Sequence, residues 1–364
     1  MTRQPTGKPG YRVGLAGASS LLGQEILRVL KERGLAISRL STFEAEEEEP
    51  DLPVLDLSEG MGFEASGEED APGSLDLLIF AARPRSKAGE TSLLGRALIA
   101  AGLAADSSAS PSSHCLVIDA AGALGKMPGA PLSVPRLEGT GPATPSTALS
   151  QVRVSPHPAA IVLSTLLLRL AARFAVKNCV AQVFFPASEI GPRAIDELQK
   201  QTLNLLTFQK IPEKVYGAQL AFNVLPRLPG KHNAELNELD IRVRHQLRRY
   251  LGDRVPMPAL QLCQVAVFYS LAFSVFVEFD QPAAAEALTA ALAGEGTSVR
   301  RHNEAAPSPI EAAGSGEILL DAVVAGRDRP NGCWIWAAVD NIRLAAENAA
   351  DIALKTLPHF RRKQ

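Results

Sequence analysis

The residue spacing with the clearest chemical meaning lies near the N-terminus. An apolar run over 11–16 leads into Gly17, and Ser20 and Gly23 follow at intervals of three before a helical pattern begins. A strand, a glycine turn and a helix are the opening of a dinucleotide-binding domain, in which the turn and the head of the helix hold a pyrophosphate. The candidate cofactor-binding residues here are Gly17, Ser19, Ser20, Leu22 and Gly23.

Cysteine chemistry is the next candidate. The chain has four cysteines, far apart, at Cys115, Cys179, Cys263 and Cys333. Two of them fall in apolar, strand-like runs, where a buried thiol is the usual occupant. No Cys-x-x-Cys pair or Cys/His cluster indicates a metal, and the count is too low for a disulfide scaffold. We therefore predict no metal site and a cytoplasmic protein.

Composition bounds the class of protein. The chain has 364 residues, of which 46% are hydrophobic and 21% charged, enough for two globular domains. Its formal net charge of −2 argues against a nucleic-acid binder, which needs a basic face. No apolar run reaches the length of a membrane span, and the polar residues 1–10 indicate a frayed tail.

The elements that must position these residues divide into two halves. The first half alternates strands and helices, and the second mixes helices with longer strands, which predicts an α/β domain followed by an α+β domain. The acidic residues 44–49 indicate a solvated loop. Strands are predicted over 11–16, 37–41, 75–82, 115–120, 180–185, 260–269, 274–279, 318–324 and 334–339. Helices are predicted over 22–34, 92–103, 159–174, 194–208, 239–250, 283–293 and 341–357.

Several motifs, in a consistent order, resemble the aspartate-semialdehyde dehydrogenase family. The most specific is Ala221-Phe222-Asn223-Val224-Leu225-Pro226, which is flanked by Gln219-Leu220. The others are Val117-Ile118-Asp119, Leu132-Ser133-Val134-Pro135, Val267-Phe268-Tyr269 and Val339-Asp340-Asn341-Ile342-Arg343. The resemblance covers roughly residues 11–358 and is strongest to the Usg-type paralogues, which depart from the catalytic pattern of the dehydrogenases.

The resemblance implies a fold and a chemistry. It implies a Rossmann-type domain over 1–132, completed by a C-terminal helix over 341–364. It also implies an α+β dimerisation and substrate domain over 133–340, and hence a homodimer. The family reaction is an NADP-dependent reductive dephosphorylation of aspartyl phosphate through a cysteine thioester.

The residues at the family's catalytic positions do not fit that reaction. A motif like N-P-N-C-x-T corresponds to the stretch from Ser155 to Ala160, which places Pro158 at the nucleophile. His157 beside it is a candidate acid or base, although we favour a solvent-exposed histidine at the start of a helix. In a motif like R-V-P-V-F-V-G-H-S, Gln264 replaces the carboxylate-binding arginine and Leu271 replaces the general base, so both functions are lost.

The substrate and phosphate positions are also altered. In a motif like D-N-S-S-A-F-R, Gly125 replaces the phosphate-binding arginine, and Arg136 occupies the acidic position of a motif like P-E-V-N. Asp240 and Arg242 replace a glutamate and a lysine on a helix that carries substrate contacts. They are candidates for a surviving anion site, but we favour solvated helix residues.

The cofactor positions leave two outcomes open. Ser20 stands where the family has a glycine, and its hydroxyl is a candidate donor to phosphate. Where the family holds the NADP 2′-phosphate with an Arg-Ser pair, this chain has Thr42, Phe43 and Glu44. An acidic residue there favours the ribose hydroxyl of NAD over NADP. Asn341 matches a residue near the nicotinamide, and a helix cap explains it equally well. Either NAD still binds, or dinucleotide binding is lost.

Two functions remain as hypotheses. We favour a homodimeric family member that has lost dehydrogenase catalysis and serves a binding or regulatory role, with an unknown protein partner as one candidate ligand. The alternative is an NAD(P)-dependent semialdehyde dehydrogenase-like oxidoreductase with a different substrate and mechanism. It could draw on five side chains: Arg136, His157, Asp240, Arg242 and Cys263.

Overall fold

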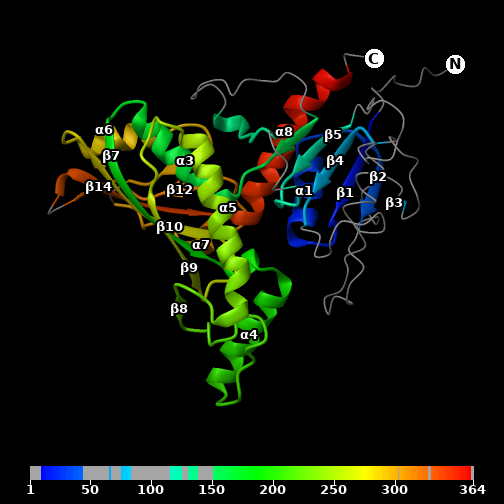
Figure 1. Cartoon of the computed structure of the whole chain (residues 1–364), viewed down its shortest axis with the longest axis horizontal. Helices are drawn as coiled ribbons and strands as arrows, with labels where there is room; N and C mark the ends of the chain where they lie inside the picture. Colours follow the sequence, from blue (N-terminus) through cyan, green and yellow to red (C-terminus); the bar gives the residue numbers. More distant parts are fainter. Residues whose placement is uncertain are drawn as a thin grey trace. The chain divides into compact units, whose positions relative to one another are not determined.

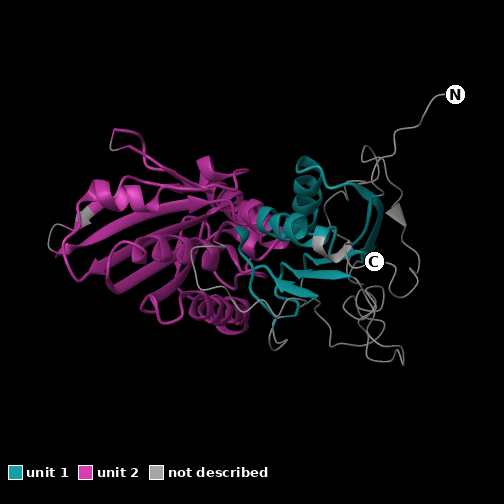
Figure 2. Ribbon diagram, turned by 90° about the horizontal axis from the view of Figure 1, so that it is seen from above, with its two compact units in different colours: residues 1–135, 145–155, 346–364 teal, residues 136–144, 156–345 magenta. Residues whose placement is uncertain are grey.

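The computed structural model describes residues 10–43, 65–66, 75–82, 115–124, 130–137, 151–301, 303–326 and 329–361. The chain divides into two compact units (Figure 2). Unit 1 consists of residues 1–135, 145–155 and 346–364, and unit 2 consists of residues 136–144 and 156–345. None of the described helices is long and apolar enough to cross a membrane.

Unit 1 is built on a parallel sheet of six strands in the order β3-β2-β1-β4-β5-β6. The chain builds outward from β1 on one side, then returns to build on the other, which is the topology of a doubly wound nucleotide-binding domain. The strands are β1 (Tyr11–Ala16), β2 (Ile37–Phe43), β3 (Ala65–Ser66), β4 (Leu77–Phe80), β5 (Leu116–Asp119) and β6 (Val152–Val154). The predicted Rossmann fold class is confirmed.

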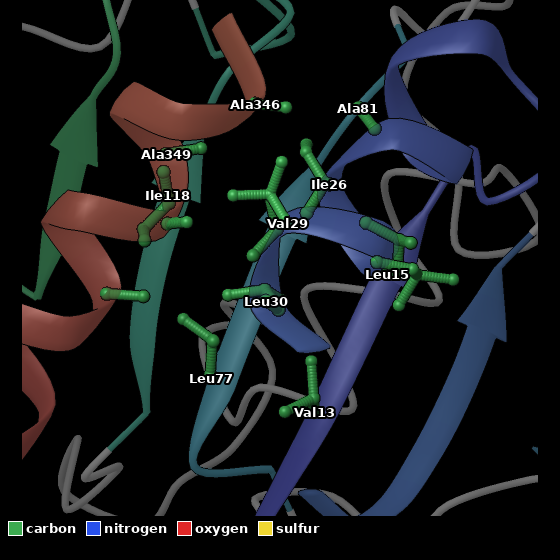
Figure 3. Close-up of a cluster of buried hydrophobic side chains, with 14 of the residues drawn as sticks. Val13, Leu15, Ile26, Val29, Leu30, Leu77, Ala81, Ile118, Ala346 and Ala349 are labelled. Carbon is green, nitrogen blue, oxygen red and sulfur yellow. The ribbon is translucent and has the colours of Figure 1, made fainter. Parts of the chain in front are cut away.

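Two helices supply one side of the core of unit 1. Helix α1 (Leu21–Glu32) buries Ile26, Val29 and Leu30, which follow the apolar stripe of its sequence. Helix α8 (Asn341–Arg361) adds alanines from 346 onward to the same cluster. Figure 3 shows these α1 side chains gathered with Ala346 and Ala349. The small alanine side chains let α8 approach the other elements of this core closely.

Unit 2 is built on a mixed sheet of eight strands. Along its path the order is β11-β12-β14-β10-β7-β9-β8, and β13 pairs with β14. The strands are β7 (Val176–Phe185), β8 (Val224–Leu225), β9 (Ala259–Val265), β10 (Leu271–Phe279), β11 (Thr297–Val299), β12 (Ile318–Leu320), β13 (Val324–Gly326) and β14 (Arg329–Val339).

Two predicted strands of unit 2 are wrong in their limits. The run 260–269 ends at Val265, because the chain turns there and the Val267 N–H donates to the Val265 carbonyl at 2.8 Å. The run 318–324 is interrupted, so it forms β12 and β13 rather than one strand. Strands β9 and β10 are not paired with each other, since each lies beside β7.

Two helices of unit 2 pack across one face of its sheet. Figure 1 shows α3 (Pro158–Ala171) and α5 (Asn233–Leu251) side by side across the strands. Helix α3 is buried on nearly all sides, which fits its almost uninterrupted apolar sequence. The other helices are α4 (Pro192–Leu206), α6 (Ala285–Leu292) and α7 (Pro309–Ala312), with 3-10 turns η1 (Pro135–Leu137), η2 (Ala187–Glu189) and η3 (Gly230–His232).

Four sequence predictions fall outside the described residues. They are the tail over 1–9, the acidic loop with Glu44, the helix over 92–103, and Gly125.

Candidate functional site

The glycine turn of unit 1 is fixed by its own packing. Gly17 has φ 83°, and a Cβ there would lie 2.4 Å from that of Ala82. A Cβ on Gly23 would lie 2.2 Å from the carbonyl oxygen of Gly17. Both glycines are therefore needed to bring the first turn of α1 against the end of β1.

The hydroxyl of Ser20 makes hydrogen bonds to the backbone of the turn itself. Its Oγ donates to the Gly17 carbonyl at 2.7 Å and accepts from the Gly23 N–H at 3.0 Å, so Ser20 caps α1. Its single proton is used on backbone carbonyls, which contradicts the interpretation of Ser20 as a phosphate donor. Neither Leu21 nor Leu22 donates its N–H to a described residue, since both start the helix. These amides, next to exposed Ser19, fit a pyrophosphate oxygen.

A second group of backbone amides in unit 1 is already occupied. Asp119 ends β5, and its side chain is fully buried. Its Oδ1 accepts from the N–H groups of Ala121, Gly122 and Ala123 at 3.2, 2.8 and 2.9 Å, and its Oδ2 accepts from that of Leu124 at 2.8 Å. Such a concave set of amides binds anions. Here the protein's own carboxylate fills it.

The head of α3 in unit 2 corresponds to the position of the family nucleophile. Pro158 is the first residue of the helix, where a missing N–H costs nothing. His157 caps the helix: its Nδ1 accepts from the Ala159 N–H at 3.0 Å. Its backbone N–H donates to Oε1 of Gln246 on α5 at 2.9 Å. Only 4% of His157 is exposed, so the prediction of a solvent-exposed histidine is wrong.

Glu189 is the functional side chain that the sequence analysis missed. Because Nδ1 of His157 accepts a hydrogen bond, its Nε2 carries the proton and donates to Oε1 of Glu189 at 2.6 Å. Asn341 donates from Nδ2 to Oε2 at 3.1 Å. The only signal in the sequence is an acidic residue just after an apolar strand. Its partners are 32 and 152 residues away, so local reading does not find them.

Glu189 is held in its ionised form. Burial alone raises the pKa of this carboxyl. The adjacent His157 with its hydrogen bond, the positive charge of Arg242 and the hydrogen bond from Asn341 outweigh burial, and the pKa lies below the ordinary glutamate value. His157, Arg242 and Asn341 are thus brought together around one carboxylate, from three different helices.

Asn341 is not the cap of α8. Its Oδ1 accepts from the Ser188 hydroxyl at 3.2 Å and from the Ser270 N–H at 3.3 Å. Asp340 caps the helix instead, because its Oδ1 accepts from the N–H groups of Ile342 and Arg343 at 2.9 and 3.0 Å. The capping interpretation of Asn341 is wrong, and its side chain belongs to the Glu189 cluster.

The two positions predicted to have lost the general base and the carboxylate-binding arginine hold buried structural side chains. Gln264 is buried in β9 and donates from Nε2 to the Phe185 carbonyl at 2.9 Å. Leu271 begins β10 with a fully buried side chain. Neither group has an acid–base function.

The remaining substrate-site candidates are separated. Asp240 pairs with Arg244 at 2.7 Å one helical turn away, and both are partly exposed. Arg242 is half-buried rather than solvated and acts on Glu189. Arg136 donates from Nη1 to the Gly316 carbonyl at 3.2 Å and lies over Gly296. The pKa of Arg169 lies below the ordinary arginine value, first because Arg169 is partly buried and second because Arg136 beside it is positively charged.

All four cysteines are buried and free. Burial raises the pKa of Cys115, Cys179 and Cys333 to about 12, and it also raises that of Cys263. A thiolate, not a thiol, is the nucleophile, so none of them is activated.

Comparisons with known proteins agree with this architecture. Residues 167–344 match the model of the semialdehyde dehydrogenase dimerisation domain. The chain is 24% identical over 349 residues to the aspartate-semialdehyde dehydrogenase of Aquifex aeolicus, covering 94% of this chain and 97% of that one. It is 24% identical over 356 residues to the USG-1 protein homolog of Pseudomonas aeruginosa, covering 96% and 98%.

Solved structures show the same fold. Aspartate semialdehyde dehydrogenase II of Vibrio cholerae superposes with a TM-score of 0.74 at 22% identity, covering 95% of this chain and 99% of that one. A probable aspartate-semialdehyde dehydrogenase of Pseudomonas aeruginosa gives a TM-score of 0.73 at 22% identity over the same shares. The fold is therefore a Rossmann-type domain joined to a semialdehyde dehydrogenase dimerisation domain. Residues 167–344 match the semialdehyde dehydrogenase dimerisation domain, and the whole chain is similar to aspartate-semialdehyde dehydrogenases and to a USG-1 homolog.

Proposed function

We propose that this protein has lost the dehydrogenase reaction of its relatives and acts as a dimeric binding protein. The observation that carries the proposal is that none of its four cysteines is an activated thiol, while Pro158 occupies the head of α3. A thioester mechanism needs a thiolate beside a base. With buried thiols of raised pKa and Leu271 at the base position, neither reactant is supplied.

The Glu189 cluster supports a structural role rather than acid–base chemistry. Both ring nitrogens of His157 are engaged, Nδ1 by the Ala159 N–H and Nε2 by Glu189, so neither is free to exchange a proton with a substrate. A glutamate with a lowered pKa is a weak base at neutral pH. The cluster fixes the head of α3, because Glu189 and Gln246 hold the residue that caps it.

A dimer is supported by an exposed apolar strip on the other face of the unit 2 sheet. Register pairs place Val324, Trp334, Phe276, Val180 and Ala259 side by side across five strands. These five side chains, which we call the apolar row, share one face and are exposed or partly exposed. Polar pairs flank the row, including Asn178–Glu278 and Gln182–Gln261. An apolar strip with a polar rim is typical of a protein interface.

Dinucleotide binding by unit 1 stays a prediction, with NAD preferred over NADP. Its support is the open pair of amides at Leu21 and Leu22, at the positive end of α1. A bound nicotinamide would supply a hydride acceptor or donor. The chain's own contribution is to hold the pyrophosphate on α1. Calorimetric titration of the purified protein with NAD and then NADP tests this, and absence of heat with both would remove the cofactor from the proposal.

A thioester-trapping experiment tests the loss of catalysis. The protein is incubated with aspartate semialdehyde and either dinucleotide, denatured in acid and weighed intact by mass spectrometry. We expect only the unmodified mass, with the same preparation shown to be folded by circular dichroism. An adduct of one acyl group on any cysteine would overturn the proposal.

The alternative function, an oxidoreductase with another substrate and mechanism, has one specific observation in its favour. The ionised Glu189 lies beside the charge of Arg242, an arrangement able to orient a polar substrate. Any NAD-linked turnover found in a substrate screen is expected to fall in Glu189→Gln and not in Asp240→Asn, which is tied to Arg244. Equal turnover in wild type and both variants would remove the basis for this alternative.

A further inference from the structure

The carboxylate of Glu189 meets a separate hydrogen-bond donor at each of its two oxygens. His157, the cap of α3, donates from Nε2 to Oε1 at 2.6 Å, and Asn341, at the start of α8, donates from Nδ2 to Oε2 at 3.1 Å. The positive charge of Arg242 on α5 acts on the same carboxylate. All four residues belong to unit 2. Two directed donors with a cation nearby are the groups that recognise a carboxylate.

The two donors are held in place by contacts that do not involve Glu189. Nδ1 of His157 accepts a backbone N–H of α3, and the backbone N–H of His157 donates to Gln246. Oδ1 of Asn341 accepts from the hydroxyl of Ser188. The directions of both donors are therefore set before the carboxylate arrives. A site that is organised in this way keeps its shape when its occupant is exchanged.

Ser270 adds a strained backbone and an unused hydroxyl beside this site. Its N–H donates to Oδ1 of Asn341 at 3.3 Å, and its φ of 75° lies in the region that favours glycine. Its hydroxyl oxygen is buried and has no hydrogen-bond partner among the described residues. Buried hydroxyls in native proteins usually have a partner, and strained residues gather where ligands bind. Both features of Ser270 indicate a ligand site rather than ordinary packing.

We propose that the donors around Glu189 form a carboxylate-binding site and that Glu189 fills it as an internal ligand. The inference deepens the proposed loss of catalysis and rests on it, since a cluster without acid–base function is available for binding. The ligand class is a small monocarboxylate, because the two donors match the two oxygens of one carboxylate. In unit 1, Asp119 likewise fills a set of backbone N–H groups with a carboxylate of the chain itself.

Two substitutions at Glu189 separate an open site from a filled one. Glu189→Ala removes one methylene and the carboxylate, which together have the size and charge of acetate. Glu189→Gln is the matched control, because it removes the same charge and keeps the space filled. Acetate should therefore bind to Glu189→Ala and be excluded from both Glu189→Gln and wild type.

Thermal unfolding of the full chain is compared in sodium acetate and in sodium chloride of equal concentration at neutral pH. Tryptophan fluorescence reports on unit 2, because both tryptophans lie in β14. At roughly ten times its dissociation constant, acetate should raise the melting temperature of Glu189→Ala by about 3–5 °C over chloride. Wild type and Glu189→Gln should melt at the same temperature in both salts. In Glu189→Ala, a further Asn341→Asp change replaces a donor with a like charge and should abolish the response.

Equal melting temperatures of Glu189→Ala in the two salts would overturn this inference. The loss of catalysis would stand, because it rests on Pro158 and the buried cysteines. A rise of the same size in Glu189→Gln, or one that survives Asn341→Asp, would place the anion elsewhere and would also overturn it. If Glu189→Ala does not fold in chloride, recovery of its circular dichroism in acetate supports the inference, and no recovery overturns it.

Discussion

The N-termini of helices α1 and α3 both present backbone N–H groups, but these groups have different hydrogen-bond partners in the two helices. At α1 a serine caps one amide and leaves the N–H groups of Leu21 and Leu22 without a described acceptor. At α3 proline removes the first N–H, His157 Nδ1 takes the second, and the His157 carbonyl takes the next two. The first helix head has two N–H groups that fit an anion, and the second has all of its first N–H groups in hydrogen bonds within the protein. The proposed loss of chemistry in unit 2 therefore does not require a loss of binding in unit 1.

The largest expected effect comes from removing the His157 side chain that caps α3. His157→Ala removes the hydrogen-bond donor to Oε1 of the buried Glu189 carboxylate and uncaps α3. We expect a loss of about 3–5 kcal/mol in the free energy of unfolding of unit 2. Both tryptophans of the chain, Trp334 and Trp336, lie in β14, so urea unfolding followed by tryptophan fluorescence reports on this unit. A loss below about 1 kcal/mol would contradict the structural role of His157.

Removing the Asp119 carboxylate from the set of backbone N–H groups that it fills in unit 1 is expected to have the next largest effect. Asp119→Ala leaves four backbone N–H groups without their acceptor, at a cost of about 2–3 kcal/mol. Because the four free N–H groups then resemble an anion site, added phosphate should raise the melting temperature of the variant more than that of wild type. Scanning calorimetry with and without phosphate measures both effects. Equal phosphate responses would mean that the carboxylate does not mimic a bound anion.

A smaller effect is expected from the cap of α1. Ser20→Ala removes the acceptor for the Gly23 N–H, which should cost about 1 kcal/mol in unit 1. Its hydroxyl proton is directed to backbone carbonyls, so NAD affinity should stay the same if NAD binds. Calorimetric titration of wild type and variant measures this. A tenfold weaker affinity in the variant would show that the hydroxyl contacts the cofactor.

The smallest effect is a pH dependence from Glu189. Its pKa is lowered by folding, so it contributes stability that is fully present above about pH 4.3, the ordinary glutamate value. This contribution is lost as the pH falls from that value through the folded pKa, because the unfolded chain takes up the proton first. In Glu189→Gln, the free energy of unfolding of unit 2 should fall less steeply as the pH is lowered through this range. The same slope of unfolding free energy with pH in wild type and variant would contradict the lowered pKa of Glu189.

Much of the fold followed from the sequence, because its signals are local. The apolar run before Gly17 and the stripe of α1 each gave an element with nearly the right limits. The apolar runs after residue 176 located the long strands β7 and β10. Strand β6 was missed because it has only three residues, with Arg153 between two valines.

The site was less predictable, because its partners are distant in sequence. The sequence predicts the absence of a nucleophile and a base from Pro158 and Leu271, and this stays a prediction. The burial of His157 depends on Glu189 and on Gln246, which lies 89 residues away, so no local pattern reports it. Likewise Asn341 at the start of a helix looked like a cap until Asp340 proved to take that role.

The most direct test of the lost chemistry is a single-turnover assay. Wild-type protein is mixed with aspartate semialdehyde, phosphate and an equimolar amount of NADP or NAD, and the absorbance of reduced nicotinamide is followed for hours. At stoichiometric concentration even a very slow dehydrogenase produces a measurable change. We expect no reduction of either dinucleotide above a control without protein. Formation of one equivalent of reduced cofactor would contradict the account, because it would require a nucleophile that the four buried cysteines do not provide.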